Sequence, residues 1–109
     1  MDITREAVAG HCVVKLTGRL DAVTAPELER FLTGIIDDGQ IRVAVDLTRL
    51  DYVSSAGLRV FLVSAKKLKA LKGEFCLAGL EGTIKEVIEI SGFPSIMPCY
   101  DTLAELTGA

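Results

Sequence analysis

The chain has 109 residues, half of them apolar and a quarter charged, and a formal net charge of −3 at neutral pH. This length and composition predict one globular domain and are not typical of a disordered segment. The acidic balance disfavours nucleic acid as a partner, and no apolar run approaches the roughly 20 residues of a membrane span, so no membrane is expected either.

The first elements are predicted to be a pair of strands. Residues 11–17 predict a strand, in which Val14 and Leu16 share one face and Lys15 lies on the other. A weaker strand over residues 3–8 is expected to pair with it across Ala9-Gly10, a two-residue hairpin signal. Gly18 is expected to end the second strand.

A helix is predicted next. Thr24 and Glu27 have the spacing of a capping box, and Pro26 is tolerated in a first helical turn. A single apolar stripe follows, and Gly39 closes the segment. The stripe consists of Leu28, Phe31, Leu32, Ile35 and Ile36.

Residues 41–47 alternate well, with small Ala44 on the second face, and predict a central strand. A second helix is expected from about Ala56 to Gly73. One face of this helix is predicted to carry Leu58, Phe61, Leu62, Ala65 and Leu68.

The last third of the chain predicts shorter elements. Residues 74–78 read as a buried strand, residues 83–91 as a helix and residues 96–97 as a last short strand. Asp101 is expected to cap a final helix. The alternation of strands and helices predicts one α/β domain with a mixed, mostly parallel sheet of about five strands and about four helices.

Ser54 and Ser55 stand between the central strand and the second helix, and three roles compete for them. A serine at a helix N-terminus caps free backbone N–H groups and contributes about 1 kcal/mol. A serine there could also accept a phosphate, since the helix terminus tolerates an anion and small neighbours such as Ala56 suit a closely packed partner. The third role is a catalytic nucleophile.

Enzymatic activity and metal binding are not expected. The residues around Ser55 do not form a G-x-S-x-G elbow, and the only histidine, His11, begins a different strand. The three cysteines are far apart and without a CxxC pair, so we expect neither disulfides nor a zinc site. Acidic residues near the N-terminus differ from a signal peptide, and a cytoplasmic location is expected.

Three stretches match the sequence pattern of a known family. They are VVKLTGRLDAVTAPEL (residues 13–28), RVAVDLTRLDYVSSAGLRVFL (residues 42–62) and ALKGEFCLAGLEGTIKEVIEISGF (residues 70–93). Together they resemble a STAS domain of the anti-sigma factor antagonist type, the SpoIIAA and RsbV kind. The resemblance covers residues 1–109 and implies a single STAS domain.

The family usually carries an aspartate, the phosphoacceptor serine, one further residue and then Gly-Leu. On this pattern Ser54 replaces the aspartate, Ser55 takes the place of the acceptor, and Gly57-Leu58 match. The resemblance therefore implies phosphorylation at Ser55, with Ser54 as the fallback. The missing aspartate motivates an alternative, a STAS scaffold or small subunit of a transport or signalling complex that is not phosphorylated.

The resemblance also implies the partners. An unphosphorylated antagonist binds an anti-sigma factor, usually a GHKL-type serine kinase, and a sigma factor is released; a PP2C-type phosphatase reverses the modification. No cofactor of the chain's own is implied, and a monomer or weak dimer is expected. Asp21 is expected to hydrogen-bond the serine loop. Partner contacts are expected from Asp21, Thr24, Ser54, Ser55, Ala56, Gly57 and Arg59.

Overall fold

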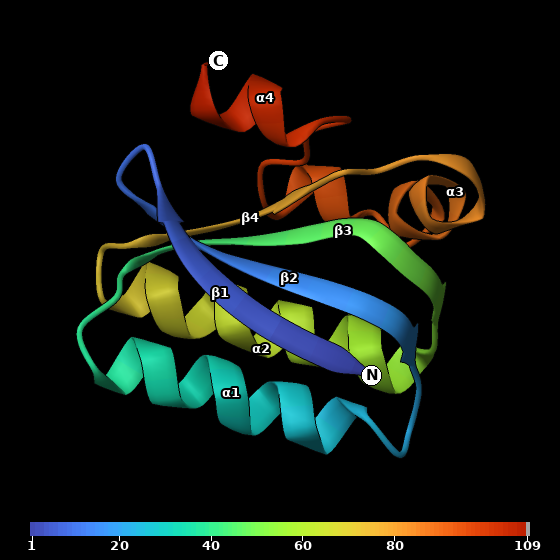
Figure 1. The fold of residues 1–109 in the computed structure, drawn as a ribbon, viewed down its shortest axis with the longest axis horizontal. Coiled ribbons are helices and arrows are strands. Elements are labelled where there is room, and N and C mark those ends of the chain that lie inside the picture. The colour runs from blue at the N-terminus through green and yellow to red at the C-terminus, as the bar shows by residue number, and fades with distance from the viewer. Residues whose placement is uncertain (109) are drawn as a thin grey trace.

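The computed structural model describes residues 1–108, which form a twisted four-stranded sheet with helices on both faces (Figure 1). The elements in chain order are β1 (Asp2–Val8), β2 (His11–Leu20), α1 (Ala25–Asp37), β3 (Arg42–Val53), α2 (Ser55–Ala70), β4 (Glu74–Ala78), α3 (Gly82–Ile90), the 3-10 turn η1 (Phe93–Ser95) and α4 (Leu103–Thr107).

The strand order is β1-β2-β3-β4, with β1 antiparallel to β2 and the other pairs parallel. The predicted hairpin is confirmed. Ala9 and Gly10 both have positive φ (51° and 82°), the conformation of a two-residue turn that matches the twist of the flanking strands. The parallel β2-β3 and β3-β4 crossovers are made by α1 and α2.

The main core lies between the sheet and the two helices α1 and α2, which cover the same face (Figure 1). The predicted stripe of α1 is confirmed except that Phe31 is only half-buried. The predicted apolar face of α2 also packs on the core, with Phe61 and Leu68 buried and Leu58, Leu62 and Ala65 half-buried. The buried residues of α2 are Gly57, Val60, Phe61, Ser64 and Leu68.

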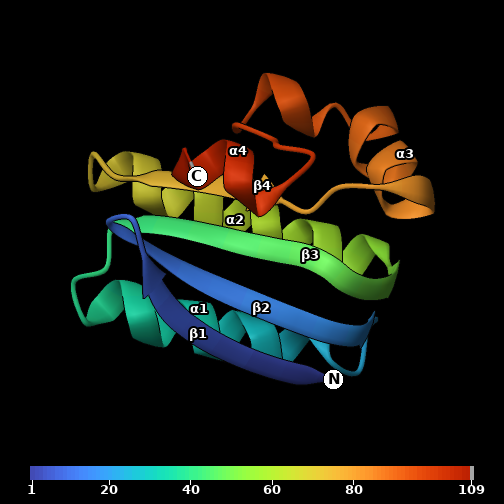
Figure 2. The same ribbon diagram turned by 45° about the horizontal axis from the view of Figure 1, so that its top comes forward.

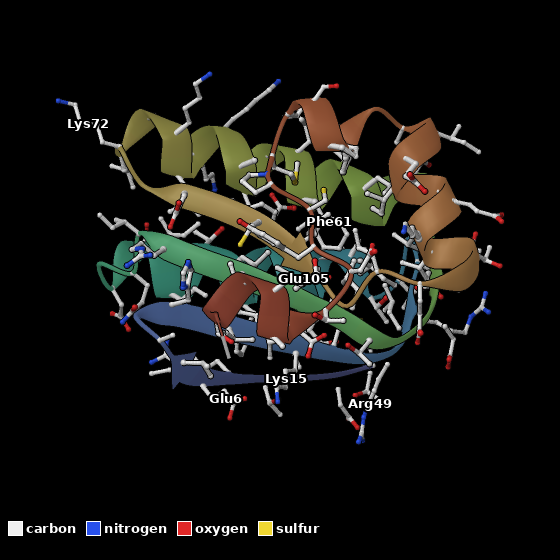
Figure 3. All side chains as sticks on the ribbon, turned by 90° about the horizontal axis from the view of Figure 1, so that it is seen from above. Glu6, Lys15, Arg49, Phe61, Lys72 and Glu105 are labelled. Carbon is white, nitrogen blue, oxygen red and sulfur yellow. The ribbon has the colours of Figure 1, made fainter. Side chains whose placement is uncertain are left out.

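The second face of the sheet is covered in part by α4, which lies over the strands in Figures 2 and 3. Val13, Ala44 and Cys76 form a small buried cluster there, and Leu103 and Leu106 pack against it. This contact explains why β3 carries the small Ala44 on that face. Among residues 1–108, no helix combines the length and apolar character that a bilayer span needs.

The sheet differs from the prediction in three ways. It has four strands, because residues 93–95 form a 3-10 turn and the chain after it meets β4 only through an isolated bridge between Cys99 and Leu77. Gly18 does not end β2 but lies within it at φ 109°, beside a register shift. β3 continues six residues past the predicted end, since Leu50 and Val53 are buried against the core and pair with the extended β2.

The cap of the last helix was also predicted wrongly. The hydroxyl of Thr102, not the carboxylate of Asp101, accepts the backbone N–H of Glu105 at 3.2 Å. Asp101 instead forms an ion pair of 2.9 Å with Lys85 of α3. Asp101 therefore joins the final segment to α3.

Candidate functional site

The two serines lie where β3 passes into α2. β3 ends at Val53, Ser54 alone connects the elements in an extended conformation (φ −94°, ψ 172°), and α2 begins at Ser55. The backbone N–H of Ser54 donates to the carbonyl of Leu20 at 2.8 Å. This bond ties the junction to the end of β2 and fixes where the helix starts.

The two hydroxyl groups have different surroundings. The side chain of Ser54 is half-buried and accepts the N–H of Gly57 at 3.4 Å, so Ser54 is the N-cap of α2. Ser55 is the first helical residue and is exposed, and its hydroxyl has no hydrogen-bond partner within residues 1–108. The capping role thus belongs to Ser54 and leaves the Ser55 hydroxyl free.

Gly57 allows the first turn of α2 to lie against the sheet. A Cβ at this position would stand 2.5 Å from Cγ and 2.7 Å from Cδ2 of Leu20, and 3.1 Å from Cγ2 of Val53. Only a glycine fits so close to these buried side chains. Because Gly57 is itself buried, it contributes to packing beneath the serine pair and not to the exposed surface.

The turn before α1 contains a capping box, but three residues earlier than predicted. Oδ1 of Asp21 accepts the N–H of Val23 at 3.0 Å and that of Thr24 at 3.1 Å, while Oγ1 of Thr24 accepts the N–H of Asp21 at 2.9 Å. Thr24 already has helical angles and makes no side-chain cap to α1, so the expected pairing with Glu27 was wrong.

Asp21 does not hydrogen-bond the serine loop within the described part of the chain, contrary to expectation. Its carboxylate is occupied by its own turn, and the neighbouring Leu20 carbonyl makes the link to Ser54. The N–H of Thr24 is the main cause that lowers the pKa of Asp21 below its ordinary value. Asp21 and Thr24 therefore order the turn next to the serines and form no hydrogen bond with them among residues 1–108.

An open groove of about 660 Å³ lies beside Ser55, between the N-terminal halves of α1 and α2. Most of its lining side chains are small or apolar, which leaves room for a partner's side chains. Three of the predicted contact residues line it, namely Ser55, Ala56 and Arg59, whereas Ser54, Gly57, Asp21 and Thr24 do not. The other lining residues are Ala22, Ala25, Pro26, Glu29, Val60 and Val63.

Two charged side chains line this groove, Arg59 on α2 and Glu29 on α1. Both are exposed, and neither forms an ion pair among residues 1–108. Arg59 follows Ser55 by four residues, which places the two side chains one above the other on the helix surface. The groove thus holds one cation next to the free hydroxyl and one carboxylate on the facing helix.

Two exposed side chains that were not predicted from the sequence lie around the same end of the sheet. Val23 is 85% exposed in the capping turn, and Tyr52 is 41% exposed on β3. The guanidinium of Arg19 lies 4.3 Å from the centre of the Tyr52 ring, a cation–π contact. Tyr52 was missed because the strand was expected to end at residue 47.

A catalytic role for Ser55 finds no support in the geometry. His11 starts β2, and the strand's other end, Leu20, adjoins Ser54. Nine residues of strand separate these ends by roughly 30 Å, so His11 cannot serve as a base for Ser55. Within residues 1–108, no three or more His, Cys, Asp or Glu side chains gather as a potential metal site.

Comparison with known proteins gives the family. Residues 2–106 match the family model of the STAS domain. The chain belongs to the STAS domain family. It is 45% identical over 98 residues, 90% of this chain and 84% of the relative, to a Bordetella bronchiseptica protein whose name, BtrV, carries the description anti-sigma factor antagonist.

Two further relatives have names of the same kind. The anti-sigma-B factor antagonist of Staphylococcus aureus is 36% identical over 84 residues, covering 77% of this STAS domain and 78% of that protein. The crystal structure of an anti-sigma factor antagonist from Mycobacterium paratuberculosis superposes with a TM-score of 0.88 at 28% identity. That match covers 98% of this chain and 92% of the other. The resemblance inferred from the sequence motifs is confirmed.

Proposed function

We propose that this STAS domain is an anti-sigma factor antagonist that binds its partner beside Ser55 and releases it when Ser55 is phosphorylated. The names of the relatives support the first half of the proposal. The observation that carries the second half is the free, exposed hydroxyl of Ser55 at the first position of α2. A kinase can reach this hydroxyl without breaking a bond of the fold.

A phosphate on Ser55 is compatible with the folded domain. The first backbone N–H groups of a helix have no partner within the helix, and the helix terminus carries about half a positive charge. Since Ser54 occupies the N–H of Gly57, the N–H groups of Ser55 and Ala56 remain to solvate an anion. Phosphorylation is therefore expected to change the surface and leave the fold intact.

The same phosphate would change the groove. It adds about 1.5–2 negative charges beside a surface where Arg59 is the one lining cation. Arg59, one turn further along α2, is positioned to pair with the phosphate and would then be lost to a partner's carboxylate. The carboxylate of Glu29 on the facing helix would add to the negative charge that repels a partner's carboxylate. A partner that packs against Ala56 would also meet the bulk of the phosphoryl group.

The partner enzymes are part of the proposal. We propose that the anti-sigma factor is a GHKL-type serine kinase and that a PP2C-type phosphatase restores the hydroxyl. ATP and metal ions would then bind to these partners. In this scheme the STAS domain acts as substrate and ligand and performs no catalysis.

A second candidate is a scaffold that does not switch. Ser54 favours it, because it stands where the family's pattern has an aspartate and its hydroxyl serves the helix cap. A kinase that recognises that carboxylate would then not modify Ser55. The scaffold predicts that binding is independent of the charge at residue 55.

Affinity purification from the native host with wild type, Ser55→Ala and Ser55→Asp as baits distinguishes the two. The switch predicts an anti-sigma factor bound by wild type and Ser55→Ala and lost with Ser55→Asp. Thr83→Asp is the matched control, since it adds the same charge to an exposed position in the first turn of α3. Equal capture by all four baits would reject the switch in favour of the scaffold.

Phosphorylation itself is tested with the captured kinase and ATP. Mass spectrometry of the intact and digested protein should locate one phosphate on Ser55, and Ser54→Ala should still be modified. If the kinase modifies a known antagonist and leaves Ser55 unmodified, the phosphorylation half of the proposal is wrong.

A further inference from the structure

A second groove, of about 470 Å³, lies on the other flank of α2 and has no lining residue in common with the groove beside Ser55. It runs between the C-terminal half of α2, the start of β4 and the segment that follows η1. Its lining includes two lysines and four apolar residues, namely Lys66, Lys69, Phe75, Ile96, Met97 and Pro98.

The apolar part of this groove is built into the fold. Phe75 and Met97 are buried and form its floor, whereas Ile96 is 53% exposed at its edge. The N–H of Met97 donates to the carbonyl of Phe93 at 2.9 Å, and the N–H of Leu77 donates to the carbonyl of Pro98 at 3.1 Å. The segment that follows η1 is therefore held against β4 without a ligand. The groove is preformed in this sense, as is typical of binding sites.

Lys66 and Lys69 supply the charge of the groove. They are three residues apart and so lie on the same face of α2. Neither ammonium group forms an ion pair within residues 1–108. Lys67 lies on the opposite flank, where it donates to Oγ1 of Thr33 at 3.3 Å. Complementing the helix dipole does not by itself explain two lysines directed to one groove.

One carboxylate, Glu74, also lines this groove, but its charge is already compensated. Oε1 of Glu74 lies 3.0 Å from Nε of Arg42 and 3.3 Å from Nε2 of His11. The hydrogen bond from Arg42 is the main cause that lowers the pKa of Glu74 below its ordinary value. The lysine charges of the groove are therefore not neutralised from within.

The positive charge of the segment that contains α2 stands out against the rest of the chain. Residues 53–73 contain five lysine or arginine residues and no carboxylate, whereas the remaining residues contain seven such cations and fifteen carboxylates. Lys72, just beyond α2, projects into solvent (Figure 3). An acidic protein thus presents one positively charged helix, the arrangement that attracts a negatively charged partner.

We infer that this second groove binds an acidic segment of a partner protein that also carries an apolar side chain. The apolar side chain packs on Phe75, Met97 and Ile96, and flanking carboxylates pair with Lys66 and Lys69. The mixture of an apolar floor and two cations at the edge favours such a segment over a purely electrostatic ligand.

Binding in the second groove is expected to be independent of the state of Ser55. Lys66, the nearer of the two lysines, follows Ser55 by eleven helical residues, a distance of about 16 Å along the axis. Charges on a protein surface are screened over about 8 Å at physiological ionic strength. The acidic segment can therefore stay bound when phosphorylation releases a partner at the first groove.

The probe is a display library of random peptides selected on the immobilised full-length protein. The inference predicts selected peptides that combine Asp or Glu with a large apolar residue. Their affinity should fall about tenfold or more in Lys66→Glu/Lys69→Glu and weaken with added salt. Ile96→Ser should weaken binding through the apolar contact, with little cost to folding because Ile96 is exposed.

The control with matched charge is Lys67→Glu/Lys72→Glu, which changes the same total charge outside the groove and should keep wild-type affinity. Lys66→Gln/Lys69→Gln serves if the charge reversal disturbs folding, which urea unfolding monitors. Ser55→Asp should bind the peptides unchanged, so that failure of the switch and failure of this site are separate results.

Three results would overturn the inference. The first is selected peptides without acidic residues, and the second is equal loss of binding in both pairs of charge variants. The third is lysine-dependent flotation with vesicles of phosphatidylcholine and phosphatidylglycerol in the absence of peptide binding, which would assign the lysines to a lipid surface.

Discussion

Gly57→Ala tests whether the first turn of α2, which carries the serine pair, packs closely against the sheet. In an ordinary helix this change stabilises by up to about 1 kcal/mol. Here the new methyl group would lie 2.5 and 2.7 Å from side-chain carbons of Leu20, which is fully buried and cannot swing aside. Overpacking of this kind costs about 1–3 kcal/mol. Two contacts below 3 Å with a fully buried side chain place this site in the upper part of that range, at about 2–3 kcal/mol. After the gain of up to about 1 kcal/mol in helix propensity, we expect a net loss of about 1–2 kcal/mol in the free energy of unfolding.

Gly34→Ala is the matched control, because it makes the same substitution inside a helix without the contact. Gly34 is exposed in α1, and a Cβ there would have no neighbour within 4 Å. The free energy of unfolding should rise by about 0.5–1 kcal/mol. The two glycines thus give opposite signs for one chemical change.

Urea unfolding followed by circular dichroism measures both variants, with the m-value as a check that the unfolding transition stays the same. Leu20→Ala should make Gly57→Ala less costly, since it removes the obstructing carbons and the two changes are then non-additive. A Gly57→Ala variant as stable as wild type would refute the account of α2 packing.

Three further predictions follow from the site and its surroundings. Ser54→Ala should lower the free energy of unfolding by about 0.5–1 kcal/mol through loss of the cap, whereas Ser55→Ala should stay within about 0.5 kcal/mol of wild type, as urea unfolding would measure. Because backbone N–H groups lower the pKa of Asp21, its carboxylate stabilises the fold above the pKa of the unfolded chain, and this contribution is lost as pH falls through the folded pKa. Asp21→Asn keeps a hydrogen-bond acceptor but cannot titrate. Its free energy of unfolding should therefore fall less steeply than that of wild type as the pH is lowered. Burial raises the pKa of Cys76 to about 12 and that of Cys99 to about 11, so both thiols should react slowly with Ellman's reagent until urea unfolds the chain, and fast labelling of the native protein would contradict their environment.

The elements that the sequence predicted well are those with a local signal. Ala9-Gly10 provides the two positive φ angles of a hairpin, so the pairing of β1 with β2 needed no distant information. The apolar stripe of residues 28–36 likewise determines which face of α1 is buried. Both predictions depend on neighbours in the chain, and both were confirmed.

The predictions that failed depend on contacts between distant segments. β3 runs to Val53 because its last residues pair with the end of β2, whose own continuation past Gly18 was not expected. The capping box was assigned to the wrong residues for a related reason. From the sequence alone, Thr24 can be either the first or the last residue of a capping box. Because β2 ends at Leu20, the box consists of Asp21 to Thr24, and Thr24 is its last residue.

The serine pair shows how one such contact determines the candidate site. From the sequence, capping and phosphate acceptance were alternatives for the two residues together. Because β3 extends to Val53 and the N–H of Ser54 is fixed to Leu20, a single residue remains between strand and helix. That residue must be the N-cap, and the next must be the first helical residue with its side chain in solvent. The length of β3 therefore separates the two serines: the hydroxyl of Ser54 caps α2, and the exposed hydroxyl of Ser55 is left without that role.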